Sequence, residues 1–120
     1  SNKEIGRVYR SMKRDLKIRT PAPTPLVYID RFCSELGLPP IVKAKTKQIV
    51  KDADEKGLTD GKSPCGVAAA CLYIAASVEG FHRTQREISE ASNTTEVTIR
   101  NRYKEICVNL GYELSLGPYN

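Results

Sequence analysis

Residues 84–110, TQREISEASNTTEVTIRNRYKEICVNL, contain the start signals of two helices that lie close together in the chain. Thr84 and Glu87 have the spacing of a capping box, in which the Thr84 hydroxyl accepts from the Glu87 amide and the Glu87 carboxylate accepts from the Thr84 amide. The helix that they start is short and runs to about Ala91. Asn93 then provides a residue that tolerates the left-handed backbone of a tight turn. These signals predict a short helix that is followed at once by a turn.

A second helix follows this turn, and its two faces differ in chemistry. Thr94 or Thr95 is placed to cap it. At 100° per residue, one face carries side chains that suit a protein core, namely Ile99, Tyr103, Ile106 and Leu110. The opposite face carries Val97, Arg100, Asn101 and Lys104. The pattern predicts a helix-turn-helix with one face toward the core and the other toward DNA.

The outward face of the second helix suits the major groove of DNA. The guanidinium of Arg100 matches the O6 and N7 acceptors of guanine, and Val97 offers a methyl contact to thymine. Asn101 offers a side-chain amide, and Lys104 offers a charge for phosphate. An ordinary solvated helix face is the alternative interpretation. The capping box and the short turn favour DNA binding.

The length and composition of the chain limit the classes of protein to which it belongs. A chain of 120 residues corresponds to one domain and buries roughly two-thirds of its unfolded surface, which is enough for a core. No apolar run reaches the length of about 20 residues that a membrane span needs. The N-terminus is charged and does not resemble a secretory signal. We expect a cytoplasmic protein that does not contact a membrane.

The cysteines and the single histidine indicate neither a metal site nor catalysis. The four cysteines form no C-x-x-C pair, and Cys65 and Cys71 lie about 120° apart around one predicted helix. Buried free thiols in a reducing compartment are therefore expected. In its sequence context His82 stands in no catalytic pattern with a cysteine or serine, and the sequence has neither a phosphate-binding glycine loop nor paired carboxylates on an apolar face. We expect no enzyme, no catalytic residue and no metal ligand.

The net charge of +5 is concentrated in the first 19 residues. This basic arm is made of Lys3, Arg7, Arg10, Lys13, Arg14, Lys17 and Arg19. Its only acids are Glu4 and Asp15, and the rest of the chain has twelve residues of each sign. A basic arm attracts a polyanion or an acidic protein surface. The alternative is a helix face that is merely soluble.

Six helical segments are predicted, with almost no strand signal. The first, residues 3–16, has an apolar stripe made of Ile5, Val8, Tyr9, Met12 and Leu16. Prolines then favour an extended linker over residues 17–23. The second helix is capped by Thr24, has Pro25 in its first turn and ends at Gly37. Its inward residues are expected to be Leu26, Ile29, Cys33 and Leu36.

The third helix opens at Pro39 and Pro40 and ends near Gly57. Leu58 follows as the apolar residue that commonly closes such a terminus. One face of this helix is expected to be buried, and it carries Val42, Thr46, Ile49 and Ala53.

Residues 63–78, SPCGVAAACLYIAASV, contain no charged residue. Ser63 is placed to cap this helix, Pro64 takes its first position and Gly80 ends it. A helix that is apolar on all sides must be surrounded by others, and its many small residues allow them to approach closely. We therefore predict an all-α bundle with this helix at the centre. The side chains expected to be buried include Cys71, Leu72, Ala75 and Val78.

The order of helices between residues 24 and 110 resembles a cyclin-like repeat, a five-helix bundle around a central apolar helix. Four segments sharpen the resemblance: KEIGRVYR (residues 3–10), GLTDGKSPCGVAAACLYIA (57–75), RTQREISE (83–90) and EVTIRNRYKE (96–105). Together they resemble the second, C-terminal repeat of archaeal transcription initiation factor B, the counterpart of eukaryotic transcription factor IIB.

This resemblance extends over residues 3–112 and implies a division of the chain. Residues 1–16 would be the last helix of the preceding cyclin-like repeat, and residues 17–23 the linker. Residues 24–112 would form the second repeat, and residues 113–120 a C-terminal tail.

The resemblance also implies a function, that of a fragment of a general transcription initiation factor. In this family the second repeat places its helix-turn-helix in the major groove just upstream of the TATA box. The matching positions for base contact in this chain are Val97 and Arg100. Contacts to the DNA backbone or groove would come from Arg83, Arg86, Thr95, Thr98, Asn101 and Lys104.

The partners implied by the resemblance are promoter DNA, TATA-binding protein and, through the full-length factor, RNA polymerase. The factor would orient the preinitiation complex in the cytoplasm of an archaeal cell, at the nucleoid. Zinc is expected only in the N-terminal ribbon of the full-length factor, so no cofactor is expected in this chain. A cyclin-type module that binds a protein without binding DNA is the alternative. A dimeric repressor is a further one, but the sequence shows no dimerisation element.

Overall fold

The structure is a computed structural model, and it describes residues 24–114. The predicted helix and basic arm of residues 1–19, the linker at 17–23 and residues 115–120 of the predicted tail lie outside the described range. The described residues contain no strand and form five helices: α2 (Pro25–Leu36), α3 (Pro40–Glu55), α4 (Pro64–Val78), α5 (Gln85–Ser92) and α6 (Glu96–Leu110). The predicted all-α fold is confirmed for this part of the chain.

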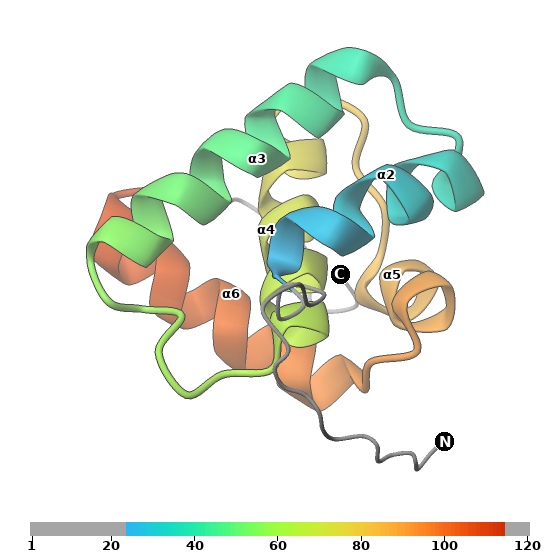
Figure 1. Ribbon diagram of the computed structural model, residues 1–120. Coiled ribbons are helices and arrows are strands. Elements are labelled where there is room, and N and C mark those ends of the chain that lie inside the picture. The colour runs from blue at the N-terminus through green and yellow to red at the C-terminus, as the bar shows by residue number, and fades with distance from the viewer. Residues whose placement is uncertain (1–23, 115–120) are drawn as a thin grey trace, which may run out of the picture.

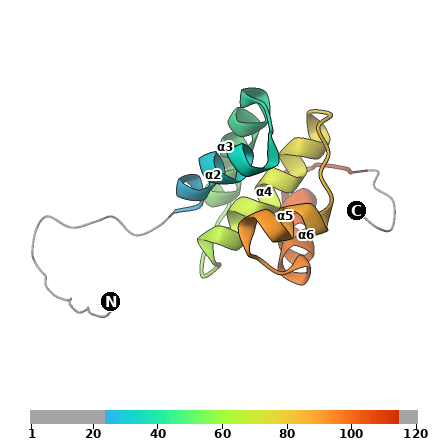
Figure 2. The same cartoon turned by 90° about the vertical axis from the view of Figure 1, so that its right-hand side faces the viewer.

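The helix α4 lies at the centre of the bundle (Figure 1). In the perpendicular view α2 and α3 lie on one side of α4, and α5 and α6 lie on the other (Figure 2). Every residue from Gly66 to Ala76 is buried. The start of the helix follows the sequence signals, since Pro64 is its first residue and the Ser63 hydroxyl accepts from the Gly66 amide at 3.4 Å. The predicted central helix is therefore confirmed.

Two side chains predicted to face inward are exposed instead. Val78 is 43% exposed, although Cys71, Leu72 and Ala75 of the same helix are completely buried. Val78 is the last residue of α4, where fewer helices surround the axis. Leu26 is 47% exposed for a similar reason, because it lies in the first turn of α2.

The ends of α2 and α3 follow the predicted signals with one exception. Thr24 is the N-cap residue of α2, but its side chain makes no capping hydrogen bond. Gly37 ends α2 with a φ of 66°, in the left-handed region that favours glycine. The Leu58 amide donates to the Ala53 carbonyl at 2.9 Å, which closes the end of α3. The predicted inward face of α3 is fully buried: Val42, Thr46, Ile49 and Ala53.

The core has two parts, which meet at α4. The larger part joins α4 to α2, α3 and α6, and it contains Ile29, Phe32, Val42, Ile49, Leu72 and Ile106. The smaller part joins α4 to α5 and α6, and it consists of Ala69, Tyr73, Ile88 and Ile99. The smaller cluster therefore holds the two helices of the predicted helix-turn-helix against α4. None of the described helices is long and apolar enough to cross a membrane.

The four cysteines are free thiols, as predicted, but they differ in burial. Cys33, Cys71 and Cys107 are buried, whereas Cys65 is only half-buried. Burial raises the pKa of the Cys33 and Cys71 thiols, and it raises the pKa of Cys107 to about 11. The three buried thiols are thus kept in the protonated form, which is a poor nucleophile.

This difference predicts that Cys65 reacts alone in the folded protein. Titration with a chromogenic disulfide at neutral pH should release one equivalent of thiolate quickly, and the remaining three should follow only when guanidinium chloride unfolds the chain. The C65S variant, as the control, should lose the fast equivalent. Rapid release of more than one equivalent from the folded wild-type chain would contradict the burial of the other thiols.

Candidate nucleic-acid interface

The helices α5 and α6 are joined by a turn whose geometry follows the sequence signals. Both bonds of the capping box are present: the Thr84 amide donates to Glu87 Oε1 at 2.9 Å, and the Glu87 amide donates to Thr84 Oγ1 at 3.1 Å. Asn93 has a φ of 59° and so takes the left-handed conformation. Thr95, one of the two predicted residues, caps α6 by accepting from the Thr98 amide at 3.2 Å. The predicted helix–turn–helix arrangement is therefore confirmed.

The inner face of α6 packs against α4 and α5. Ile99 is completely buried, and Tyr103 is half-buried with its ring centroid 4.6 Å from that of Tyr73 in α4. Burial raises the pKa of the Tyr73 hydroxyl to about 12, so this side chain stays neutral below that pH. The apolar packing fixes which side of α6 is turned away from the bundle.

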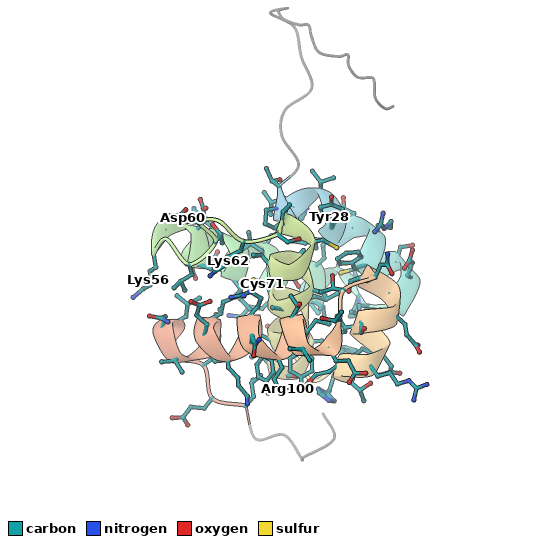
Figure 3. All side chains as sticks on the ribbon, turned by 90° about the horizontal axis from the view of Figure 1, so that it is seen from below. Tyr28, Lys56, Asp60, Lys62, Cys71 and Arg100 are labelled. Carbon is teal, nitrogen blue, oxygen red and sulfur yellow. The ribbon has the colours of Figure 1, made fainter. Side chains whose placement is uncertain are left out.

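The outer face of α6 carries the side chains predicted to meet DNA. Val97 is 57% exposed, Asn101 and Lys104 are exposed, and Arg100 is half-buried. Within residues 24–114, the side chains of Arg100, Asn101 and Lys104 make no hydrogen bond or ion pair, whereas the neighbouring Arg102 pairs with Glu105 at 3.1 Å. Figure 3 shows Arg100 on α6, well apart from the charged residues labelled on the loop between α3 and α4.

This arrangement leaves two cations and an amide free to bind an external partner. Arg100 is half-buried but makes no side-chain hydrogen bond within residues 24–114, so its guanidinium donors remain available for a bidentate contact to guanine. The exposed methyl groups of Val97 lie about one helical turn earlier on the same face. Side chains with these properties suit the edges of bases in a major groove, which has room for one α-helix.

Two of the other predicted DNA contacts are engaged within the protein. Arg83 donates to the carbonyls of Phe81 and His82 at 3.1 Å, and to the carbonyl of Leu36 at 3.2 Å. Its guanidinium thus joins the loop before α5 to the end of α2. Arg86 is exposed on α5 and pairs with Glu90 at 3.4 Å.

The two threonines at the start of α6 also have partners in the protein. The Thr95 hydroxyl donates to Thr98 Oγ1 at 3.0 Å while it caps the helix. The methyl group of Thr98 faces Gly66 in α4, where a Cβ on the glycine would lie 3.1 Å from Thr98 Cγ2. Thr95 remains exposed and Thr98 is half-buried.

Sequence reasoning missed the contacts that join α4 to the turn between α5 and α6. Cys65 Sγ donates to the Ser92 carbonyl at 3.1 Å and lies 3.4 Å from Thr94 Oγ1. The only sequence signal for this junction was a glycine next to Cys65 inside a helix, where glycine is normally unfavourable. Among the described residues, no group of three or more histidine, cysteine or acidic side chains is arranged to hold a metal ion.

Comparison with known proteins identifies the family. The chain matches the family described as Transcription factor TFIIB repeat over residues 18–109. It is 53% identical to the transcription initiation factor IIB of Methanocaldococcus jannaschii over 95% of its own length and 17% of that protein. It is 53% identical to the same factor of Methanopyrus kandleri, over 92% of the chain and 36% of that protein.

The corresponding factor of Archaeoglobus fulgidus is 51% identical over 95% of the chain and 35% of that protein. The chain thus spans about a third or less of the length of these relatives. The match to the family covers all five described helices almost completely, including the central α4 and the pair α5–α6. The chain therefore belongs to the Transcription factor TFIIB repeat family and has the cyclin-like helical fold of that family.

Proposed function

We propose that this chain is part of a general transcription initiation factor and binds promoter DNA upstream of the TATA box through α6. The observation that carries the proposal is the outer face of α6, where Arg100, Asn101 and Lys104 have no side-chain partner among residues 24–114 and lie beside the exposed Val97. Val97 and Arg100 would contact bases. The DNA backbone or groove would be contacted by Arg86, Thr95, Thr98, Asn101 and Lys104, whereas Arg83, which was also predicted to contact DNA, takes a different role.

Some of these residues make hydrogen bonds or ion pairs within the protein, and these interactions indicate different roles for them in the interface. Arg83 would have to give up carbonyl contacts to reach phosphate with its guanidinium, so we give it the role of positioning the start of α5. Arg86 is exposed, and surface ion pairs of this kind are worth only about 0–1 kcal/mol, so it could exchange Glu90 for a phosphate at little cost. The exposed start of α6 at Thr95 would approach the backbone, because helix N-termini favour phosphate.

The partners proposed for the whole factor are TATA-binding protein, which would bind together with it on the promoter, and RNA polymerase, which it would recruit. The names of the relatives, transcription initiation factor IIB, support this role. Residues 24–112 would be one cyclin-like repeat, and residues 1–16 the last helix of the repeat before it. The basic arm would add attraction to DNA or to an acidic protein surface.

A cyclin-type module that binds protein but not DNA is the second candidate. It is favoured by the fold itself, in which the other four described helices pack around α4 without requiring any DNA contact. It gives no reason for three polar side chains with no partner among the described residues on one face of α6, and for that reason we prefer the DNA-binding proposal.

A selection experiment tests the proposal directly. The 120-residue chain and TATA-binding protein would be incubated with DNA duplexes that contain a TATA box and a randomised segment upstream of it. One sequence should be enriched, and it should bind at least about tenfold more tightly than its scrambled form, because each wrong base pair costs about 1–3 kcal/mol. If the chain joins the complex equally well on every upstream sequence, the protein-binding alternative is preferred.

A further inference from the structure

The C-terminus of α5 differs from the other helix ends in the described part of the chain. After each of α2, α3, α4 and α6, the next residue donates its backbone N–H to a carbonyl of the last turn. Asn93, which follows α5, makes no such backbone bond among the described residues. Since a helix leaves its last four carbonyls without intrahelical partners, α5 needs another group to satisfy them.

Side chains supply this closure, and one of them belongs to α4. The carbonyl of Ser92, the last residue of α5, accepts from Cys65 Sγ at 3.1 Å and from Thr94 Oγ1 at 3.5 Å. Cys65 and Thr94 are themselves 3.4 Å apart. The end of α5 and the turn after it are thus tied to a residue that lies 27 positions earlier in the chain.

The next residue of α4 meets the start of α6. Gly66 is buried, and a Cβ added to it would lie 3.1 Å from Thr98 Cγ2, which is tighter than an ordinary van der Waals contact. The Thr98 amide is held in turn by the capping hydroxyl of Thr95. The first turn of α6 therefore rests directly on the backbone of α4, at a place where a larger residue would push it away.

We propose that the first turn of α4 sets the angle between α5 and α6, with Cys65 holding the end of α5 and Gly66 seating the start of α6. The backbone conformation of this turn of α4 is restrained, because Pro64 fixes its first φ and Ser63 caps the helix. The consequence for DNA rests on the function proposed above: Cys65 and Gly66 would be positioning residues for base recognition. Arg100 lies only two residues after Thr98, so a shift of that contact would displace its guanidinium.

Gly66→Ala gives the first test, because it should reduce recognition without lowering stability. Alanine favours a helix over glycine, and a small shift of α6 relieves the new contact with Thr98, so the midpoint of urea unfolding should not fall. Displacement of α6 should at the same time reduce the ratio of binding to the enriched duplex over its scrambled form. We expect a loss of at least about fivefold, the lower end of what one side-chain–base pair contributes to discrimination.

Cys65 gives an independent test with a matched control. Cys65→Ala removes the donor to Ser92 and should lower the same binding ratio, whereas Cys65→Ser keeps a donor and should retain most of it. Cys33→Ala makes the same chemical change at a buried thiol of α2, for which no hydrogen bond to the turn between α5 and α6 is seen among the described residues. That control should destabilise the chain without changing the binding ratio.

A measurement without DNA separates the positioning role from the proposed function. Residual dipolar couplings of backbone amides would report the orientation of residues 96–110 relative to residues 85–92 in each variant. Gly66→Ala should change this orientation, and the double variant G66A/T98S should restore it, because serine lacks the methyl group that alanine meets while keeping the hydroxyl.

These measurements have distinct outcomes. If the orientation stays the same in Gly66→Ala and Cys65→Ala, or changes while the binding ratio does not, the positioning role is wrong. If the wild-type chain itself shows no preference for any upstream sequence, the proposed function is wrong. In that case the dipolar couplings alone decide whether the first turn of α4 sets the angle between α5 and α6.

Discussion

Replacing Leu72 with alanine is expected to lower the free energy of unfolding by on the order of 2–5 kcal/mol. Leu72 is completely buried in α4 and belongs to the larger part of the core, where neighbours from several helices surround it. The substitution removes the transfer energy of the lost methyl and methylene groups and leaves a cavity that the packed helices can fill only partly. Equilibrium unfolding in urea, followed by helical circular dichroism, measures the loss.

Val78→Ala is the matched control for this prediction, because it lies on the same helix with 43% of its surface exposed. It should cost less than about 1 kcal/mol, since little buried area is lost and alanine has the higher helix propensity. If the two substitutions cost the same, burial in the centre of the bundle would not be the main source of stability. The difference between the variants therefore tests the place of α4 more sharply than either value alone.

The ends of the helices could be predicted because their signals are local. Ser63 and Pro64 start α4, and the capping box starts α5, through bonds that span three residues. Asn93 takes the left-handed turn conformation, which its own side chain tolerates better than most. Such interactions need no knowledge of the rest of the fold.

The burial of side chains at helix ends could not be predicted in the same way. Helical periodicity places Leu26 and Val78 on inward stripes, and both are substantially exposed. Periodicity gives the direction of a side chain around its axis, but not how far along that axis the neighbouring helices extend. The error therefore falls on the first turn of α2 and the last residue of α4, and the middle of each stripe is correct.

In the candidate site, too, the local features could be predicted and the contacts between distant residues could not. The face that carries Val97 and Arg100 follows from the 100° repeat of α6 and could be predicted. The Arg83 contact to the Leu36 carbonyl spans 47 residues, and the Cys65 contact to Ser92 spans 27. Both contacts depend on how the helices pack, so neither could be predicted from the sequence. The positive charge of Arg83 therefore predicted a contact to DNA, whereas in the structure its guanidinium binds backbone carbonyls.

Arg100→Ala is expected to weaken binding by about 1–3 kcal/mol, and only on DNA that bears the enriched upstream sequence. The guanidinium is free of side-chain partners among residues 24–114, so its removal leaves no unpaired group inside the protein and should leave the unfolding midpoint almost unchanged. Arg100→Lys should not restore binding, because an ammonium group lacks the planar fork that matches the two acceptors of guanine. Binding titrations on the enriched and scrambled duplexes, with TATA-binding protein present, measure the difference.

Lys104 and Val97 separate recognition from simple attraction. Lys104→Ala should weaken binding to both duplexes equally and should lower the slope of log affinity against log salt by about one unit, because it removes one phosphate contact. Val97→Ala should act only on the enriched duplex, with a smaller loss than Arg100→Ala and little dependence on salt, since it removes an apolar contact to a base.

Equal losses from Arg100→Ala on both duplexes would mean that α6 attracts DNA without reading its sequence. The protein-binding alternative would then be preferred over base recognition.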